Sequence, residues 1–116
     1  MKELEHRIGQ LFIVGFADEQ PTRTFLSFLA DEQIGGVILF EENCRTHELA
    51  RENIVAVKSL YGSSTPLIAI DQEGGRVCRL KGAPAEYRAA AEYGRDNRLG
   101  QFAEDFRRSA VFLESL

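Results

Sequence analysis

One short segment of this sequence, residues 68–82 (IAIDQEGGRVCRLKG), combines the residue types that bind polar ligands. Its carboxylate, Asp71, directly follows an apolar run, and Arg76 and Arg79 come shortly after it. Ligands of parallel α/β proteins bind beyond the carboxyl ends of the strands, so Asp71 is placed where a ligand-binding carboxylate would lie. The alternative is a structural carboxylate that caps a helix or pairs with an arginine in a loop.

A pair of carboxylates is a second chemical interpretation of the same segment. Asp71 and Glu73 are two residues apart, which in an extended chain places both on one side at roughly 6–7 Å. Retaining glycosidases use carboxyl groups about 5–5.5 Å apart and inverting ones about 6.5–9.5 Å apart, so the spacing permits a hydrolytic pair. The same spacing fits a solvated surface, and on the residues alone both interpretations stay open.

Two glycines, Gly74 and Gly75, let this segment turn sharply or approach a ligand closely. Followed by Arg76, they match neither the dinucleotide-binding pattern G-x-G-x-x-G nor the phosphate-binding pattern G-x-x-x-x-G-K-S/T. A nucleotide is therefore not the ligand that we expect. Cys78 has no histidine base near it in the sequence, and we expect a structural thiol rather than a reactive one.

Composition and charge are those of an ordinary globular protein. The chain has 116 residues, of which 44% are hydrophobic and 28% charged, and this length suits one domain. The net charge of −4 gives no basic surface for nucleic acid or anionic lipid, and no apolar run is long enough to span a membrane. The first ten residues mix charges and contain no apolar leader, and the two cysteines suggest no disulfide framework, so we expect a cytoplasmic chain.

Strands and helices alternate in the hydrophobic pattern. Two of the three apolar blocks are continuous rather than alternating, which is typical of strands buried on both faces of a parallel sheet. We predict strands within 11–16, 35–40 and 66–70, helices over 2–10, 22–32, 46–61 and 98–115, and a surface loop over 81–97 with a helical turn around 86–93. This order predicts an α/β fold with about three parallel strands and two open sheet edges.

Three stretches of the sequence resemble, in order, the N-terminal domain of glycoside hydrolase family 3. They are IGQLFIVGF (8–16), IGGVILFEEN (34–43) and PLIAIDQEGGRVCRL (66–80), and the final stretch DFRRSAVFLESL (105–116) is similar to a helix of the family. The similarity is greatest to the bacterial β-N-acetylhexosaminidases of the family, which are cytoplasmic enzymes of peptidoglycan recycling.

The resemblance implies the N-terminal part of a TIM-type (β/α)8 barrel that binds a sugar at the carboxyl ends of its strands. It implies retaining hydrolysis of terminal β-linked N-acetylglucosamine, with no metal and no organic cofactor. Asp71 matches the family aspartate that accepts hydrogen bonds from sugar hydroxyls, and Gly74, Gly75 and Arg76 match the motif that shapes the loop behind it. This assignment argues against the hydrolytic pair of Asp71 with Glu73.

The resemblance also implies that the catalytic residues lie in later segments. The family supplies its general acid/base from a Lys-His-Phe-Pro-Gly-His-Gly-like loop and its nucleophilic aspartate from a later strand end, and neither occurs in residues 1–116. We therefore expect residues 1–116 to form a partial barrel domain that binds a β-N-acetylglucosaminide and hydrolyses nothing by itself. The alternative is a non-catalytic carbohydrate-binding module, or one that self-associates through its open strand edges.

Overall fold

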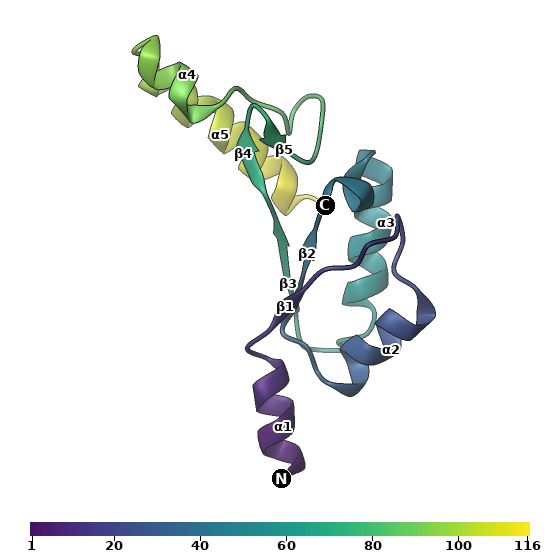
Figure 1. Ribbon diagram of the computed structural model, residues 1–116. Coiled ribbons are helices and arrows are strands. Elements are labelled where there is room, and N and C mark those ends of the chain that lie inside the picture. The colour runs from purple at the N-terminus through teal and green to yellow at the C-terminus, as the bar shows by residue number, and fades with distance from the viewer. The chain divides into compact units, whose positions relative to one another are not determined.

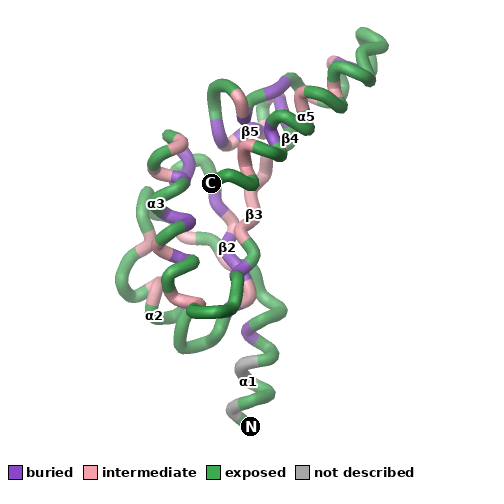
Figure 2. Tube along the Cα trace, turned by 180° about the vertical axis from the view of Figure 1, so that it is seen from behind, coloured by how far each residue is buried: buried purple, intermediate pink, exposed green. Residues whose placement is uncertain are grey.

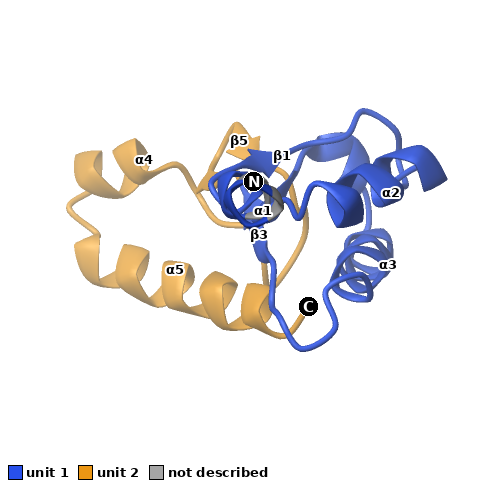
Figure 3. Ribbon diagram, turned by 90° about the horizontal axis from the view of Figure 1, so that it is seen from below, with its two compact units in different colours: residues 1–70 blue, residues 71–116 orange. Residues whose placement is uncertain are grey.

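The computed structural model describes the backbone of residues 1–116 and all side chains except those of Lys2, Glu5 and His6. The chain forms two compact units, residues 1–70 and residues 71–116 (Figure 3). No helix in the described part of the chain is long and apolar enough to cross a membrane.

The first unit alternates helices with strands, as the hydrophobic pattern predicts (Figure 1). Its elements are α1 (Lys2–Gly9), β1 (Ile13–Val14), α2 (Arg23–Asp31), β2 (Gly36–Leu39), the short 3-10 helix η1 (Glu41–Cys44), α3 (His47–Lys58) and β3 (Leu67–Ile70). The strands form one parallel sheet in the order β1-β2-β3. The prediction of an α/β fold with three parallel strands is therefore confirmed.

The three strands differ in burial, and only the central one fits the expectation of a strand buried on both faces. In β2, Val37 and Leu39 are buried, whereas Leu67 of β3 is 64% exposed and the rest of that strand is half-buried. The reason is the strand order, because β1 and β3 are the edge strands of this sheet and each pairs only with β2.

Threonine caps fix where two helices of the first unit begin. The hydroxyls of Thr22 and Thr46 each accept a hydrogen bond from the backbone N–H three residues on, at 3.1 Å in both cases. Such caps satisfy a donor that the first turn leaves without an intrahelical partner. The buried apolar residues of this unit come from α2, β2, η1, α3 and the chain just before β2, and Figure 2 colours buried positions along the chain. They are Leu29, Ile34, Val37, Leu39, Cys44, Ala50, Ile54 and Val57.

The second unit contains a hairpin that the sequence did not lead us to expect. Its elements are β4 (Gln72–Gly74), β5 (Val77–Cys78), α4 (Ala90–Arg95) and α5 (Leu99–Glu114). The strands β4 and β5 pair antiparallel with an irregular register. They are too short, at three and two residues, to show an alternating pattern. The helical turn expected around 86–93 lies further along, as α4, whereas the long last helix occurs as predicted.

Candidate ligand-binding site

The carboxylate of Asp71 comes immediately after β3, at the carboxyl end of a parallel strand. Its side chain is 42% exposed, so a ligand has access to it. The Arg79 guanidinium lies beside it, with Nη2 of Arg79 3.7 Å from Oδ2 of Asp71. An ion pair of this length and exposure contributes little to stability, about 0–1 kcal/mol. Polar groups of a ligand can therefore replace this contact at small cost.

The side chain of Gln72, the next residue, is the centre of the hydrogen bonds around this site. Its Oε1 accepts from the backbone N–H groups of Arg79 at 2.9 Å and Leu80 at 3.1 Å. Its Nε2 donates to the carbonyls of Leu80 at 3.0 Å and Ala85 at 3.1 Å, and to the sulfur of Cys78. The amide thus holds residues 79–85, which follow the hairpin, against the residue next to Asp71.

The two glycines sit where side chains have no room. Gly74 has φ +83, and a Cβ there would lie 2.4 Å from the carbonyl oxygen of Arg88 and 2.7 Å from the ring of Tyr87. Gly75 has φ +60, and its Cβ would lie 2.6 Å from the side chain of Ala89. Both conformations and both close approaches favour glycine. The glycines therefore let the segment 87–89 pack directly on the hairpin.

Two other charged residues of the predicted segment, Arg76 and Glu73, lie on the hairpin. Arg76 is exposed in the turn between β4 and β5, and Glu73 is exposed on β4. The structure does not test whether Glu73 pairs with Asp71 in hydrolysis, an interpretation that the family resemblance argues against. Burial raises the pKa of the Cys78 thiol, which disfavours the thiolate that a nucleophile needs. A structural role for Cys78 fits this direction.

Two buried asparagines, Asn43 and Asn53, hold the strand ends of the first unit, and sequence reasoning did not single out their roles. The amide nitrogen of Asn43 donates to the backbone carbonyl of Asp18 at 2.7 Å, and its oxygen accepts from Phe40 N–H at 2.8 Å. Asn53 donates to the carbonyls of Glu19 and Asn43. These bonds tie the loop after β1 to η1 and α3. The only signal was the asparagine that follows the second apolar block.

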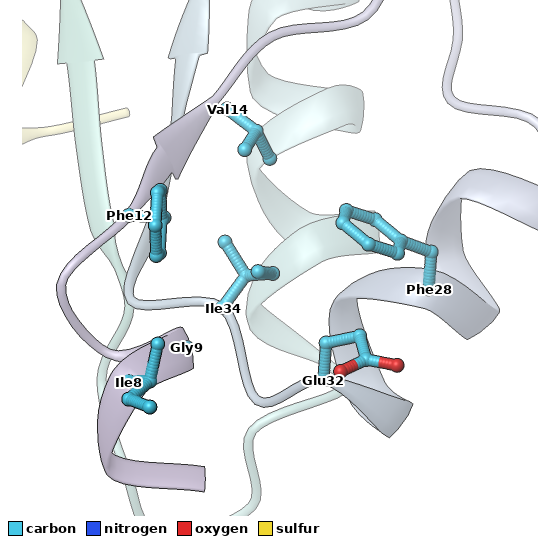
Figure 4. A pocket seen from close by; sticks show the side chains of 7 residues that line it. All are labelled: Ile8, Gly9, Phe12, Val14, Phe28, Glu32 and Ile34. Carbon is cyan, nitrogen blue, oxygen red and sulfur yellow. The ribbon is translucent and has the colours of Figure 1, made fainter. Parts of the chain in front are cut away.

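An apolar groove of about 370 Å³ opens at the other end of the strands of the first unit (Figure 4). Ile8, Phe12, Phe28 and Ile34 line it from α1, α2 and the chain around the beginnings of β1 and β2, together with the carboxylate of Glu32. In parallel α/β folds the amino ends of the strands serve stability, whereas the carboxyl ends bind ligands. We therefore take Asp71, rather than this groove, as the candidate ligand-binding position.

The chain is thus an α/β protein with three parallel strands, and a solvent-accessible carboxylate follows the carboxyl end of its last parallel strand. Residues 3–111 match the model of the glycosyl hydrolase family 3 N-terminal domain. The chain belongs to this family, and the resemblance seen in the sequence is confirmed.

Curated relatives and solved structures agree with the family. A Beta-hexosaminidase of Alkalilimnicola ehrlichii is 40% identical over 74 residues, covering 60% of this chain and 21% of the relative. One of Xylella fastidiosa is 33% identical over 73 residues, with coverage of 60% and 21%. The chain thus spans about a fifth of the length of these relatives.

Two solved structures share the fold. A glycoside hydrolase family 3 β-N-acetylglucosaminidase from Paenibacillus has a TM-score of 0.66 and 25% identity, covering 74% of this chain and 17% of that one. NagZ from Neisseria gonorrhoeae, solved in complex with N-trifluoroacetyl-D-glucosamine, has a TM-score of 0.59 and 31% identity, with coverage of 66% and 22%.

Proposed function

We propose that this chain supplies one sugar-binding contact of a retaining β-N-acetylhexosaminidase, through the carboxylate of Asp71. The observation that carries the proposal is the accessible Asp71 carboxylate at the end of β3 with the Arg79 guanidinium beside it. The family membership supports it, as do the names of the relatives and the glucosamine derivative bound by the similar NagZ.

The pair of side chains has the complementary chemistry that a sugar requires. A carboxylate only accepts hydrogen bonds and a guanidinium only donates them, whereas each sugar hydroxyl does both. Asp71 would accept from one hydroxyl while Arg79 donates to the same or a neighbouring oxygen. Charge-assisted hydrogen bonds of this kind are stronger than neutral ones and fix the orientation of the sugar.

The rest of the reaction belongs, in this proposal, to other segments of a (β/α)8 barrel. The substrate would be a terminal β-linked N-acetylglucosamine, as in the cytoplasmic recycling of cell-wall muropeptides. Covalent catalysis needs a nucleophile and an acid/base group, and binding contacts cannot replace them. We therefore expect no turnover of a chromogenic N-acetylglucosaminide by residues 1–116 alone. Turnover that co-purifies with the pure chain and is lost in Asp71→Asn would overturn this expectation.

Sugar binding is tested by saturation-transfer NMR with N-acetyl-D-glucosamine as the probe. The wild-type chain should transfer saturation to the sugar, and Asp71→Asn should reduce the transfer strongly because an amide replaces the charged acceptor. Glu73→Gln is the matched control, since it makes the same chemical change two residues away on an exposed position. Equal signals from all three proteins, or none from the wild type, would contradict the proposal.

Self-association is a second candidate, favoured by the apolar side chains around the edge strand β1. Leu11 is 82% exposed, Phe12 54% and Ile13 47%. An apolar edge strand can pair with another chain. Light scattering that finds a discrete dimer or tetramer, reduced to monomer by Ile13→Lys, would support it. A monomer at all concentrations would exclude it.

A further inference from the structure

We infer that Gln72 is a positioning residue for sugar recognition, because it sets the geometry of the Asp71 carboxylate relative to the Arg79 guanidinium. The inference rests on the proposed function and assigns a role to a side chain that does not itself face the ligand. Gln72 is attached to both members of the pair.

Gln72 holds one member through the covalent chain and the other through a hydrogen bond. It is the residue next to Asp71, and its Oε1 accepts from the backbone N–H of Arg79 at 2.9 Å. The position from which the Arg79 side chain starts is thereby fixed relative to the backbone of Asp71. The hydroxyl of Tyr87 donates to the backbone carbonyl of Gln72, which fixes the remaining side of this peptide.

The surroundings of the amide admit only one orientation. Its oxygen faces two N–H donors, of Arg79 and Leu80, while its nitrogen faces two carbonyl acceptors, of Leu80 and Ala85. A flipped amide would put donor against donor and acceptor against acceptor. The side chain therefore has one defined position. Through its hydrogen bond to the Arg79 N–H, this defined position also fixes the backbone of Arg79.

If Gln72 only stabilised the fold, losing either half of its amide would weaken ligand binding in step with thermal stability. The oxygen of Gln72 accepts from the N–H groups of Arg79 and Leu80, whereas its nitrogen donates to the carbonyls of Leu80 and Ala85, so only the oxygen contacts Arg79. Changing one half at a time therefore tests the positioning of Arg79 separately from the stability of the fold. A variant that keeps the oxygen half and loses the nitrogen half distinguishes the two roles.

The test compares two variants of Gln72 in the full 116-residue chain. Gln72→Met keeps the size of the side chain and removes both halves. Gln72→Glu keeps an acceptor for the Arg79 N–H but turns a carboxylate toward the carbonyls of Leu80 and Ala85. Glu73→Gln, on the neighbouring exposed position, is the control. Two-dimensional NMR measures amide exchange at Arg79, and a titration with N-acetyl-D-glucosamine measures affinity.

We expect Gln72→Met to speed exchange of the Arg79 amide about tenfold or more and to weaken sugar binding by a similar factor. Gln72→Glu should recover a large part of both, although its thermal stability is no higher than that of Gln72→Met. If Gln72→Met does not fold, Gln72→Glu against the control carries the test. Affinity that follows thermal stability across the variants would overturn the inference, as would unchanged affinity when Arg79 loses its protection.

The inference and the proposed function fail in different ways. If the wild-type chain binds no N-acetyl-D-glucosamine, the proposed function fails. The positioning claim is then decided in the ligand-free protein by the Nε–H resonance of Arg79. That resonance should move in Gln72→Met and stay in place in Glu73→Gln. A resonance that is the same in both variants would contradict the positioning role.

Discussion

The interiors of the two units of this chain are built from different contacts. Residues 1–70 have a parallel sheet whose central strand is buried, and apolar side chains from two helices pack against it. Residues 71–116 have a short hairpin and two helices, and their interior combines Leu80, Tyr87 and Tyr93 with side chains bonded to backbone, such as Gln72 and Ser109. Both units bury apolar side chains, but only the first has a buried sheet strand, and the second, which carries the candidate site, relies on the amide of Gln72 to hold its hairpin.

The largest effect is expected from a cavity in the first unit. Leu29 of α2 is completely buried, and Leu29→Ala should lower the free energy of unfolding by about 2–5 kcal/mol, the range for large-to-small core substitutions. Urea denaturation followed by circular dichroism measures it. Val55→Ala, at a position 59% exposed on α3, should change the value by less than about 0.5 kcal/mol. Equal effects of the two substitutions would contradict an apolar core in this unit.

A nearly equal effect should follow from one methyl group in the hairpin of the second unit. Gly74→Ala combines a positive φ with a contact of 2.4 Å to a backbone oxygen, and should cost about 2–4 kcal/mol. Gly82→Ala is the control, because Gly82 has φ +77 with open space around its Cβ and pays only the strain of about 1 kcal/mol. Amide exchange should accelerate in residues 72–93 and not in residues 29–57. If Gly82→Ala lowered the free energy of unfolding as much as Gly74→Ala, close packing would not be the reason for the loss.

A smaller loss is expected where the first unit relies on a polar side chain. Asn43→Asp keeps the acceptor for Phe40 N–H but points a carboxylate at the carbonyls of Phe16 and Asp18. Because a buried polar group then loses its partners, unfolding at neutral pH should be easier by about 1–3 kcal/mol. Protonation of the new carboxyl restores a donor, so the loss should shrink in acid. A pH-independent loss would contradict this account.

The smallest effect is a pH dependence in the second unit. The hydrogen bond from the Tyr93 hydroxyl to Asp105, at 2.7 Å, holds the pKa of Asp105 below its usual 3.8. A depressed folded-state pKa stabilises the protein above pH 3.8, and this contribution is lost as the pH falls through the lowered value. Tyr93→Phe should therefore destabilise the chain near neutral pH and approach the wild type in strong acid. Parallel stability curves for the two proteins would contradict this contribution.

The first unit was predicted well from the sequence because its strands and helices each leave a hydrophobic pattern in it. Continuous apolar blocks and helical periodicity fix the order of strands and helices, and both threonine caps lie at expected helix starts. The hairpin after Asp71 was missed, because two strands of two and three residues carry no periodicity. Their geometry comes from Gln72, Tyr87 and the two glycines acting over up to fifteen residues of chain.

The candidate site was predicted only in part, for a similar reason. Asp71 could be picked out because a carboxylate after a buried strand is a recognisable pattern. That Arg79 rather than Arg76 stands beside it depends on the turn at 75–76 and on the amide of Gln72, which no local pattern encodes. Asn43 and Asn53 act through contacts across 25 and 34 positions, which spacing alone does not reveal.

The central claim is that the carboxylate of Asp71, and not the apolar groove at the opposite ends of the strands, is the ligand-binding feature of this chain. A crystal structure of the chain soaked with N-acetyl-D-glucosamine tests it most directly. We predict a sugar hydroxyl within hydrogen-bond distance of the Asp71 carboxylate, with Arg79 turned toward the same sugar, and no sugar there in Asp71→Asn crystals. A sugar seated instead against Ile8, Phe12 and Phe28, or one that binds unchanged in Asp71→Asn, would contradict the account.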